Sequence, residues 1–136
     1  MTIKSTLRTV DVSDRPFGLP LEIVLDLPAP PSVNRTRKVD FKSLRMVNEW
    51  KYAADALVMA TRRPGDPRRI RGQFELLITI SNTHTRVDLD NGLKSLIDYL
   101  RRIEVIEDDS PKFMRRITIE WGTAPEGCRV TVRPYP

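Results

Sequence analysis

Alternating apolar and charged residues mark the first strand of the chain. Leu21-Glu22-Ile23-Val24-Leu25-Asp26-Leu27 has the pattern of a strand with one buried face. It stops at Pro28-Ala29-Pro30-Pro31, because proline cannot donate to a sheet ladder. A second strand is predicted from Phe74 to Ile80 by the apolar residues Phe74, Leu76, Ile78 and Ile80. Two final strands are predicted at Arg115 to Trp121 and Arg129 to Val132, joined by residues 123–127. Trp121 is expected to lie on the buried face of its strand.

Two segments have helical periodicity instead. From Phe41 to about Thr61, apolar residues recur at three- and four-residue steps, and the predicted buried face consists of Met46, Val47, Trp50, Ala53, Ala54, Leu57 and Val58. A second helix is expected to run to about Arg102, with Asp88 or Asp90 as its cap. Its predicted buried face consists of Leu93, Leu96, Ile97 and Leu100.

The order of elements is therefore strand, helix, strand, helix, strand, strand. This order predicts a single α+β domain in which two main helices pack on a four-stranded mixed or antiparallel sheet. The domain is expected to span residues 21–136 and to follow an N-terminal arm, residues 1–20, in which residues 6–12 can add an edge strand.

Composition narrows the class of protein. The 136 residues fit one domain, and 23 Lys and Arg against 18 Asp and Glu give a net charge of +5, which favours an anionic partner such as nucleic acid. Cys128 is the only cysteine and His84 the only histidine, so an intramolecular disulfide and a four-ligand zinc site are excluded. Cys128 is expected to be a small buried residue at the start of a strand. No membrane span or signal peptide is evident, so a cytoplasmic protein is expected.

Acidic residues nevertheless gather in one part of this basic chain. Asp88-Leu89-Asp90-Asn91-Gly92-Leu93-Lys94 is followed, after one predicted helix, by Asp108-Asp109. Carboxylates brought together repel each other unless a cation or a salt-bridge network holds them. Three carboxylates and water form the oxygen shell that Mg²⁺ or Mn²⁺ prefers, and a lysine beside them can stabilise charge on a phosphate.

The same residues have a structural interpretation. Asp90, Lys94 and Asp98 lie four residues apart and can form a solvated ladder on one helix face, worth about 0.3–0.5 kcal/mol per pair. Asp88 can be a helix cap and Asp108-Asp109 a turn. Asp88, Asp90 and Asp109 have no evident basic partner in the sequence apart from Arg86, which favours the metal site. Arg86 can pair with Asp88 or reach a phosphate, and spacing alone leaves both interpretations of the cluster open.

Taken in order, these segments resemble the RusA family of Holliday junction resolvases, which are phage- and prophage-associated endonucleases of DNA recombination and repair. An apolar strand ends in Pro30-Pro31-Ser32 and then Asn34-Arg35, similar to the family's Pro-Pro-Ser-x-Asn motif. Asp88-Leu89-Asp90-Asn91 with Lys94 is similar to its Asp-x-Asp-Asn-x-x-Lys motif. Asp98 follows on the same helix, and Asp109 lies nineteen positions after Asp90, as in the family. The resemblance covers about residues 21–134.

The resemblance implies a homodimer that needs Mg²⁺ or Mn²⁺, uses no small-molecule cofactor, and cuts four-way DNA junctions by paired, symmetric nicks. It implies that Asp88, Asp90 and Asp109 are metal-binding catalytic carboxylates, that Lys94 is the catalytic lysine, and that Asp108 is a supporting metal ligand. Asn34 and Arg35 lie in the family's loop. We expect the candidate DNA-binding residues to be Asn34, Arg35, Arg37, Lys38 and Arg86. Asp98 is expected to be a helix-face partner of Lys94.

Two departures from the family pattern concern the ends of these segments. The family often has an Ala-Gly-type turn between the helix and the acidic pair, whereas this chain reads Arg102-Ile103-Glu104-Val105. A helix that lacks its terminal glycine must end in another way, which affects where Asp108 and Asp109 lie. The arm of about twenty residues is also longer than the family minimum, and the sequence assigns it no role.

Two alternative functions remain open. The protein could bind junctions without catalysis, or it could be a metal nuclease for other branched DNA.

Overall fold

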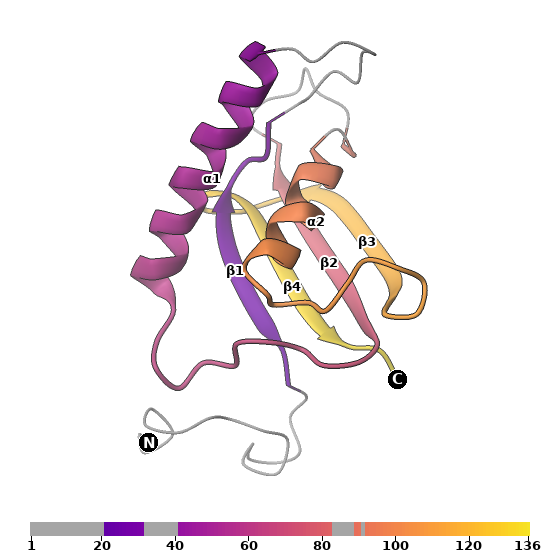
Figure 1. The fold of residues 1–136 in the computed structure, drawn as a ribbon. Coiled ribbons are helices and arrows are strands. Elements are labelled where there is room, and N and C mark those ends of the chain that lie inside the picture. The colour runs from indigo at the N-terminus through magenta and orange to yellow at the C-terminus, as the bar shows by residue number, and fades with distance from the viewer. Residues whose placement is uncertain (1–20, 32–40, 83–88, 91) are drawn as a thin grey trace.

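A computed structural model describes residues 21–31, 41–82, 89–90 and 92–136. Its elements follow the predicted order: β1 (Ile23–Pro28), α1 (Phe41–Thr61), β2 (Phe74–Ser81), α2 (Leu93–Arg102), β3 (Met114–Gly122) and β4 (Gly127–Pro134) (Figure 1). The predicted α+β class and element order are therefore confirmed. The expected arm, residues 1–20, and its edge strand lie outside the described residues.

The four strands form one mixed sheet in the order β1-β4-β2-β3. β4 is antiparallel to both β1 and β2, whereas β2 and β3 are parallel and are connected through α2. β4 therefore lies between β1 and β2, and the connection from β3 to β4 crosses over β2. The core residues of the four strands align across the sheet, as in the row Leu25, Val130, Ile78 and Ile119.

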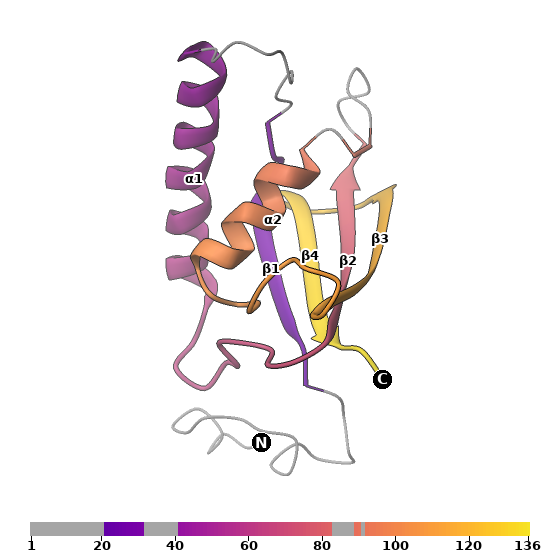
Figure 2. The ribbon, with the colours of Figure 1, turned by 45° about the vertical axis from the view of Figure 1, so that its right-hand side comes forward.

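Both helices cover the same face of this sheet, with α1 beside β1 and α2 across the middle strands (Figure 2). Alternate strand residues point toward the helices because side chains alternate along a strand. They form one core with apolar residues of both helices, and the fully buried side chains include Leu27, Phe74, Leu76, Leu96, Tyr99, Leu100 and Val130. Cys128 is buried at the start of β4, as predicted, and burial raises the pKa of its thiol to about 12.

Trp50 and Tyr99 connect the two helices and β1. The indole Nε1 of Trp50 donates to the carbonyl of Pro28 at 2.8 Å, and its ring meets the Tyr99 ring edge-on with centroids 5.1 Å apart. The Tyr99 hydroxyl donates to Asp55 on α1 at 2.7 Å, and Arg102 approaches the same carboxylate at 3.4 Å. Burial and this hydrogen bond raise the pKa of Tyr99. These contacts fix α2 relative to α1.

The predicted buried face of α1 is only partly correct. Trp50 and Ala54 are buried, and Val47, Leu57 and Val58 are partly buried. The prediction was wrong for Met46 and Ala53, which are exposed. α1 therefore packs on the rest of the domain over a narrower stripe than its apolar residues suggest.

Charged side chains occupy the sheet face that the helices do not cover. Glu75 on β2 is only 7% exposed and lies between Arg133 at 3.2 Å and Arg116 at 3.6 Å. Asp26 and Arg129 pair across β1 and β4 at 2.7 Å. Trp121 was predicted to be buried, and this is wrong: it is 38% exposed, because β3 is an edge strand. Neither described helix is long and apolar enough to cross a membrane.

Candidate functional site

The acidic motif leads directly into α2. The helix begins at Leu93 with Gly92 as its N-cap residue, and the Leu93 N–H donates to the carbonyl of Asp90 at 3.1 Å. No side-chain cap hydrogen bond is made there, so the prediction that Asp90 caps the helix was wrong. Asp88, the other predicted cap, lies outside the described residues. The Asp90 side chain is exposed, which leaves its carboxylate available to solvent.

The segment after β1 packs against this helix start. A Cβ atom built on Gly92 would lie 2.7 Å from both Cβ and Cγ of Pro30 and 3.1 Å from the Pro30 carbonyl oxygen. Real Cβ atoms essentially never approach a neighbour this closely, so only glycine fits. Pro30 and Gly92, which comes two residues after Asp90, therefore meet although they are about sixty residues apart in sequence.

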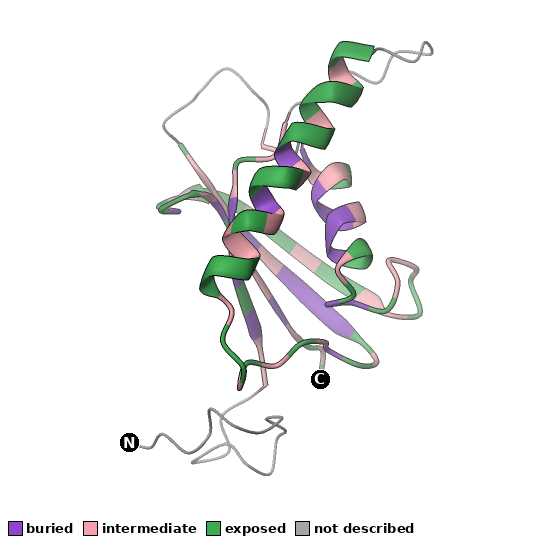
Figure 3. Cartoon of the chain, turned by 60° about the vertical axis from the view of Figure 1, so that its left-hand side comes forward, coloured by how far each residue is buried: buried purple, intermediate pink, exposed green. Residues whose placement is uncertain are grey.

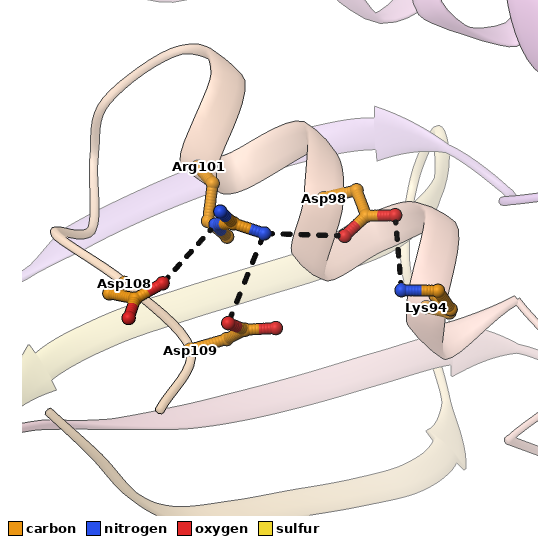
Figure 4. Close-up of polar contacts among 5 residues, drawn as sticks. All are labelled: Lys94, Asp98, Arg101, Asp108 and Asp109. Atoms are coloured by element: carbon orange, nitrogen blue, oxygen red, sulfur yellow. Dashed lines mark ion pairs between the residues drawn. The ribbon is translucent and has the colours of Figure 1, made fainter. Parts of the chain in front are cut away.

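Charges of alternating sign continue from there along α2 (Figure 4). Lys94 lies 3.5 Å from Asp98, and Asp98 lies 3.9 Å from Arg101. Arg101 in turn lies 3.5 Å from Asp108 and 3.9 Å from Asp109. We call these five residues the α2 charge row. The predicted pairing of Asp98 with Lys94 is confirmed, whereas the inference that Asp109 lacks a basic partner was wrong.

The end of α2 directs the chain back to this row without a glycine. Glu104 has a φ of 64°, the left-handed conformation that a helix-terminal glycine usually takes. Its N–H donates to the Arg101 carbonyl at 3.0 Å, and the Val105 N–H donates to the Leu100 carbonyl at 3.1 Å. These two bonds are the Schellman pattern, completed by burial of Val105 and Leu100. Arg69 secures Glu104 by binding its carbonyl and its carboxylate, each at 3.0 Å.

The fold changes the ionisation of Asp108 in this row. Its pKa lies below the usual value because the Asp109 N–H donates to its carboxylate, with smaller contributions from the Ser110 hydroxyl and the charge of Arg101. Asp108 and Asp109 therefore present adjacent hard oxygen ligands of the type that Mg²⁺ prefers. Arg101 supplies the positive charge beside them in this structure.

The structure describes some of the predicted site residues and not others. Asp90, Lys94, Asp108 and Asp109 are described, whereas Asp88 and the candidate DNA-binding residues Asn34, Arg35, Arg37, Lys38 and Arg86 lie outside the described residues. Within the described part of the chain, no three His, Cys, Asp or Glu side chains group closely enough to hold a metal ion. The donor set fits Mg²⁺ in chemical type, and a complete ligand set there would need Asp88.

Arg101 is the site residue that sequence reasoning missed. Its spacing of three residues from Asp98 is a signal for a helix-face pair, but its contact with Asp108 and Asp109 depends on how the chain returns after α2.

Comparison of the sequence with models of known protein families finds no match, and comparison with curated proteins also finds none.

Proposed function

We propose that this protein is a Mg²⁺-dependent endodeoxyribonuclease that acts as a homodimer and resolves four-way DNA junctions. The observation that carries the proposal is the packing of Pro30 against Gly92. This contact joins two of the segments on which the RusA resemblance rests, and the α2 charge row links the same helix to Asp108 and Asp109. Segments scattered over some eighty residues thus converge on one short helix.

The residues divide the work of phosphodiester hydrolysis as follows. Asp88, Asp90 and Asp109 would hold Mg²⁺, with Asp108 in support, and the ion would supply positive charge to the phosphoryl oxygens. Lys94 has a largely exposed ammonium group, which Asp98 orients and which is free to approach a phosphate from the same helix face. Its point charge stabilises the negative charge that develops as the phosphodiester breaks.

Junction binding follows from the charge of the chain and from symmetry. The net charge of +5 favours a polyanion, and contacts to phosphates would make binding shape-selective and strongly dependent on salt. Asn34, Arg35, Arg37, Lys38 and Arg86 are the proposed DNA contacts. A four-way junction has near-twofold symmetry, so two copies related by a twofold axis supply one cut each.

The test is cleavage of a synthetic four-way junction with and without Mg²⁺. We expect the wild type to make paired nicks and Asp90→Asn to bind the junction without cutting it. Glu120→Gln, which removes a carboxylate from β3 outside the charge row, is the matched control and should cut like the wild type. Equal cutting by the wild type and Asp90→Asn would refute the site assignment.

One observation favours a second candidate, a junction-binding protein that does not cut. Arg101 already lies beside both Asp108 and Asp109 and offsets part of their negative charge, so these carboxylates have a structural role that requires no metal. This candidate predicts junction binding that is the same with and without Mg²⁺ and no nicking by the wild type. A panel of flaps, forks and linear duplexes, tested beside the junction, would reveal a metal nuclease for another branched DNA.

A further inference from the structure

The first half of α1 has no buried residue. Every residue from Phe41 to Glu49 is exposed or partly exposed, and Trp50 is the first to be buried. In Figure 3 this half of the helix extends past the sheet, with most of its surface exposed. α1 is one continuous helix of 21 residues, so its packed second half supports this half, whose own surface stays exposed.

The exposed side of α1 carries one aromatic side chain in this half and another just beyond it. Phe41 is 82% exposed and Tyr52 is 81% exposed. They are eleven residues apart, which is close to three full turns, so they lie on the same side of α1. That side is opposite to Trp50 and Ala54, which pack on the core. Exposed aromatic residues in line on one helix face are typical of a protein–protein contact.

Opposite charges lie on the same surface between the two aromatic residues. Arg45 and Glu49 are both exposed, and neither forms an ion pair with another residue that the structure describes. The midpoint between Phe41 and Tyr52 falls between Met46 and Val47, and the midpoint between Arg45 and Glu49 is Val47. The aromatic pair and the charged pair are therefore arranged about nearly the same point of the helix.

We propose that this surface of α1 binds the α1 helix of a second copy of the chain in antiparallel orientation. A twofold axis on the exposed side of α1, at the height of residues 46 and 47, places Phe41 against Tyr52 of the second copy and, on the same flank, Arg45 against Glu49 of the second copy. Each contact then occurs twice. The aromatic pair and the charged pair are thus both self-complementary about one axis. This arrangement fits a second copy of the same helix better than an unrelated partner.

The size of the contact is also adequate. Aromatic side chains bury about 150–250 Å² each, so Phe41 and Tyr52 supply roughly half of the ~800 Å² per partner that a stable interface needs. Arg45 and Glu49, together with the aliphatic stem of Lys42 and the partly exposed Leu44, add to this on the flanks. The inference deepens the proposed function, because it names the surface through which the homodimer forms.

Sedimentation equilibrium of the full chain tests the proposal. The wild type is expected to dimerise, and Tyr52→Glu should weaken dimerisation at least about tenfold, because it places a charge against the Phe41 ring of the second copy. Met59→Glu is the matched control, since Met59 is 83% exposed on the same side of α1 but lies beyond the overlap of the two helices. Circular dichroism checks that helix content is unchanged in both variants.

Charge exchange tests the orientation. Arg45→Glu and Glu49→Arg should each weaken dimerisation, because like charges would then face each other in both copies of the contact between residues 45 and 49. The double variant Arg45→Glu with Glu49→Arg should restore dimerisation to within about threefold of the wild type, because opposite charges face each other again.

Several outcomes would overturn the inference. The wild type could stay monomeric at every concentration, or Tyr52→Glu could dimerise like the wild type. Met59→Glu could dissociate as completely as Tyr52→Glu, or the double charge exchange could fail to restore dimerisation. Junction cleavage measured on the same preparations separates the two proposals. A dimer that follows these expectations but cuts no DNA refutes the function and not the surface, and a monomer that cuts refutes the surface and not the nuclease.

Discussion

Gly92 lies so close to Pro30 that a Cβ atom on the glycine would fall 2.7 Å from the proline Cβ. The φ of Gly92 is −100°, a value that any residue adopts, so the glycine is required by space and not by backbone conformation. The contact holds the start of α2 against the segment that follows β1. Substitutions at these two positions therefore test whether the candidate site depends on close packing.

The first prediction concerns Gly92→Ala. The methyl group should force Pro30 and the helix start apart and lower the free energy of unfolding by about 1–3 kcal/mol, as overpacking does elsewhere. Urea denaturation measures the change. Pro30→Gly removes the ring atoms that the methyl group meets, so the double variant should lose less stability than the sum of the two single variants. Strict additivity would show that the two residues do not touch.

The second prediction concerns Arg101 and assumes the proposed metal site. Arg101→Gln removes a positive charge beside Asp108 and Asp109, so the affinity for Mn²⁺ should rise about threefold to tenfold. Electron paramagnetic resonance of free Mn²⁺ measures this without any cleavage assay. Arg115→Gln, an exposed arginine that contacts the Pro111 carbonyl instead of these carboxylates, is the control. Weaker Mn²⁺ binding by Arg101→Gln would mean that the guanidinium arranges the ligands and does not compete with the ion.

The third prediction concerns acid stability. The pKa of the Asp108 carboxyl is lower in the folded chain than in the unfolded chain, where it has its ordinary value of 3.8. The ionised carboxylate therefore stabilises the fold at pH values above 3.8. This stabilisation is lost as the pH falls through the lower pKa of the folded chain. Asp108→Asn should therefore show a smaller fall in melting temperature below about pH 4 than the wild type. Ser110→Ala should move the pKa of Asp108 upward toward its ordinary value in an NMR titration. An unchanged titration would exclude the Ser110 hydrogen bond.

The fourth prediction concerns the left-handed residue at the end of α2. Glu104→Gly should stabilise the protein by up to about 1 kcal/mol, because a left-handed non-glycine residue costs about 1–2 kcal/mol and the exposed pair with Arg69 contributes less. The Arg69 contact with the Glu104 carbonyl is retained. Glu104→Ala, the control, loses the ion pair and keeps the strain, so it should be less stable than the wild type. Thermal denaturation of the three proteins gives the order.

The fifth prediction concerns the contact between the helices. Tyr99→Phe removes the hydroxyl that donates to Asp55, and should lower the free energy of unfolding by about 1–2 kcal/mol. Arg102→Gln removes only an exposed contact with the same carboxylate at 3.4 Å and should change stability by less than about 1 kcal/mol. If the two variants were equally destabilised, the buried hydroxyl would have no special role.

The sequence predicts the elements of this fold better than their arrangement. Strands such as β1 and β2 have one buried face, so alternation of apolar residues reveals them. The order β1-β4-β2-β3 depends on pairing between residues that are far apart, such as Leu25 with Val130, and no local pattern contains it. Trp121 shows the same limit, because its exposure follows from the edge position of β3.

The candidate site likewise has contacts that the sequence predicts and contacts that it does not. The pairing of Lys94 with Asp98 is a local consequence of helix geometry and was predicted. The approach of Arg101 to Asp109 depends on a left-handed Glu104, which turns the chain without the glycine that a sequence pattern would seek. The meeting of Pro30 with Gly92 required the whole sheet to be assembled.

The central position of β4 has a consequence for the order of folding. β1 joins the sheet only through β4, which leaves the ribosome after every other strand described here. During synthesis, β2, α2 and β3 can assemble early as a local parallel unit, whereas β1 must wait about a hundred residues for its neighbour. The segment after β1 that packs against the start of α2 is therefore fixed in the sheet only after β4 has been made, so a polypeptide interrupted before Gly127 lacks the support that this contact gives the candidate site.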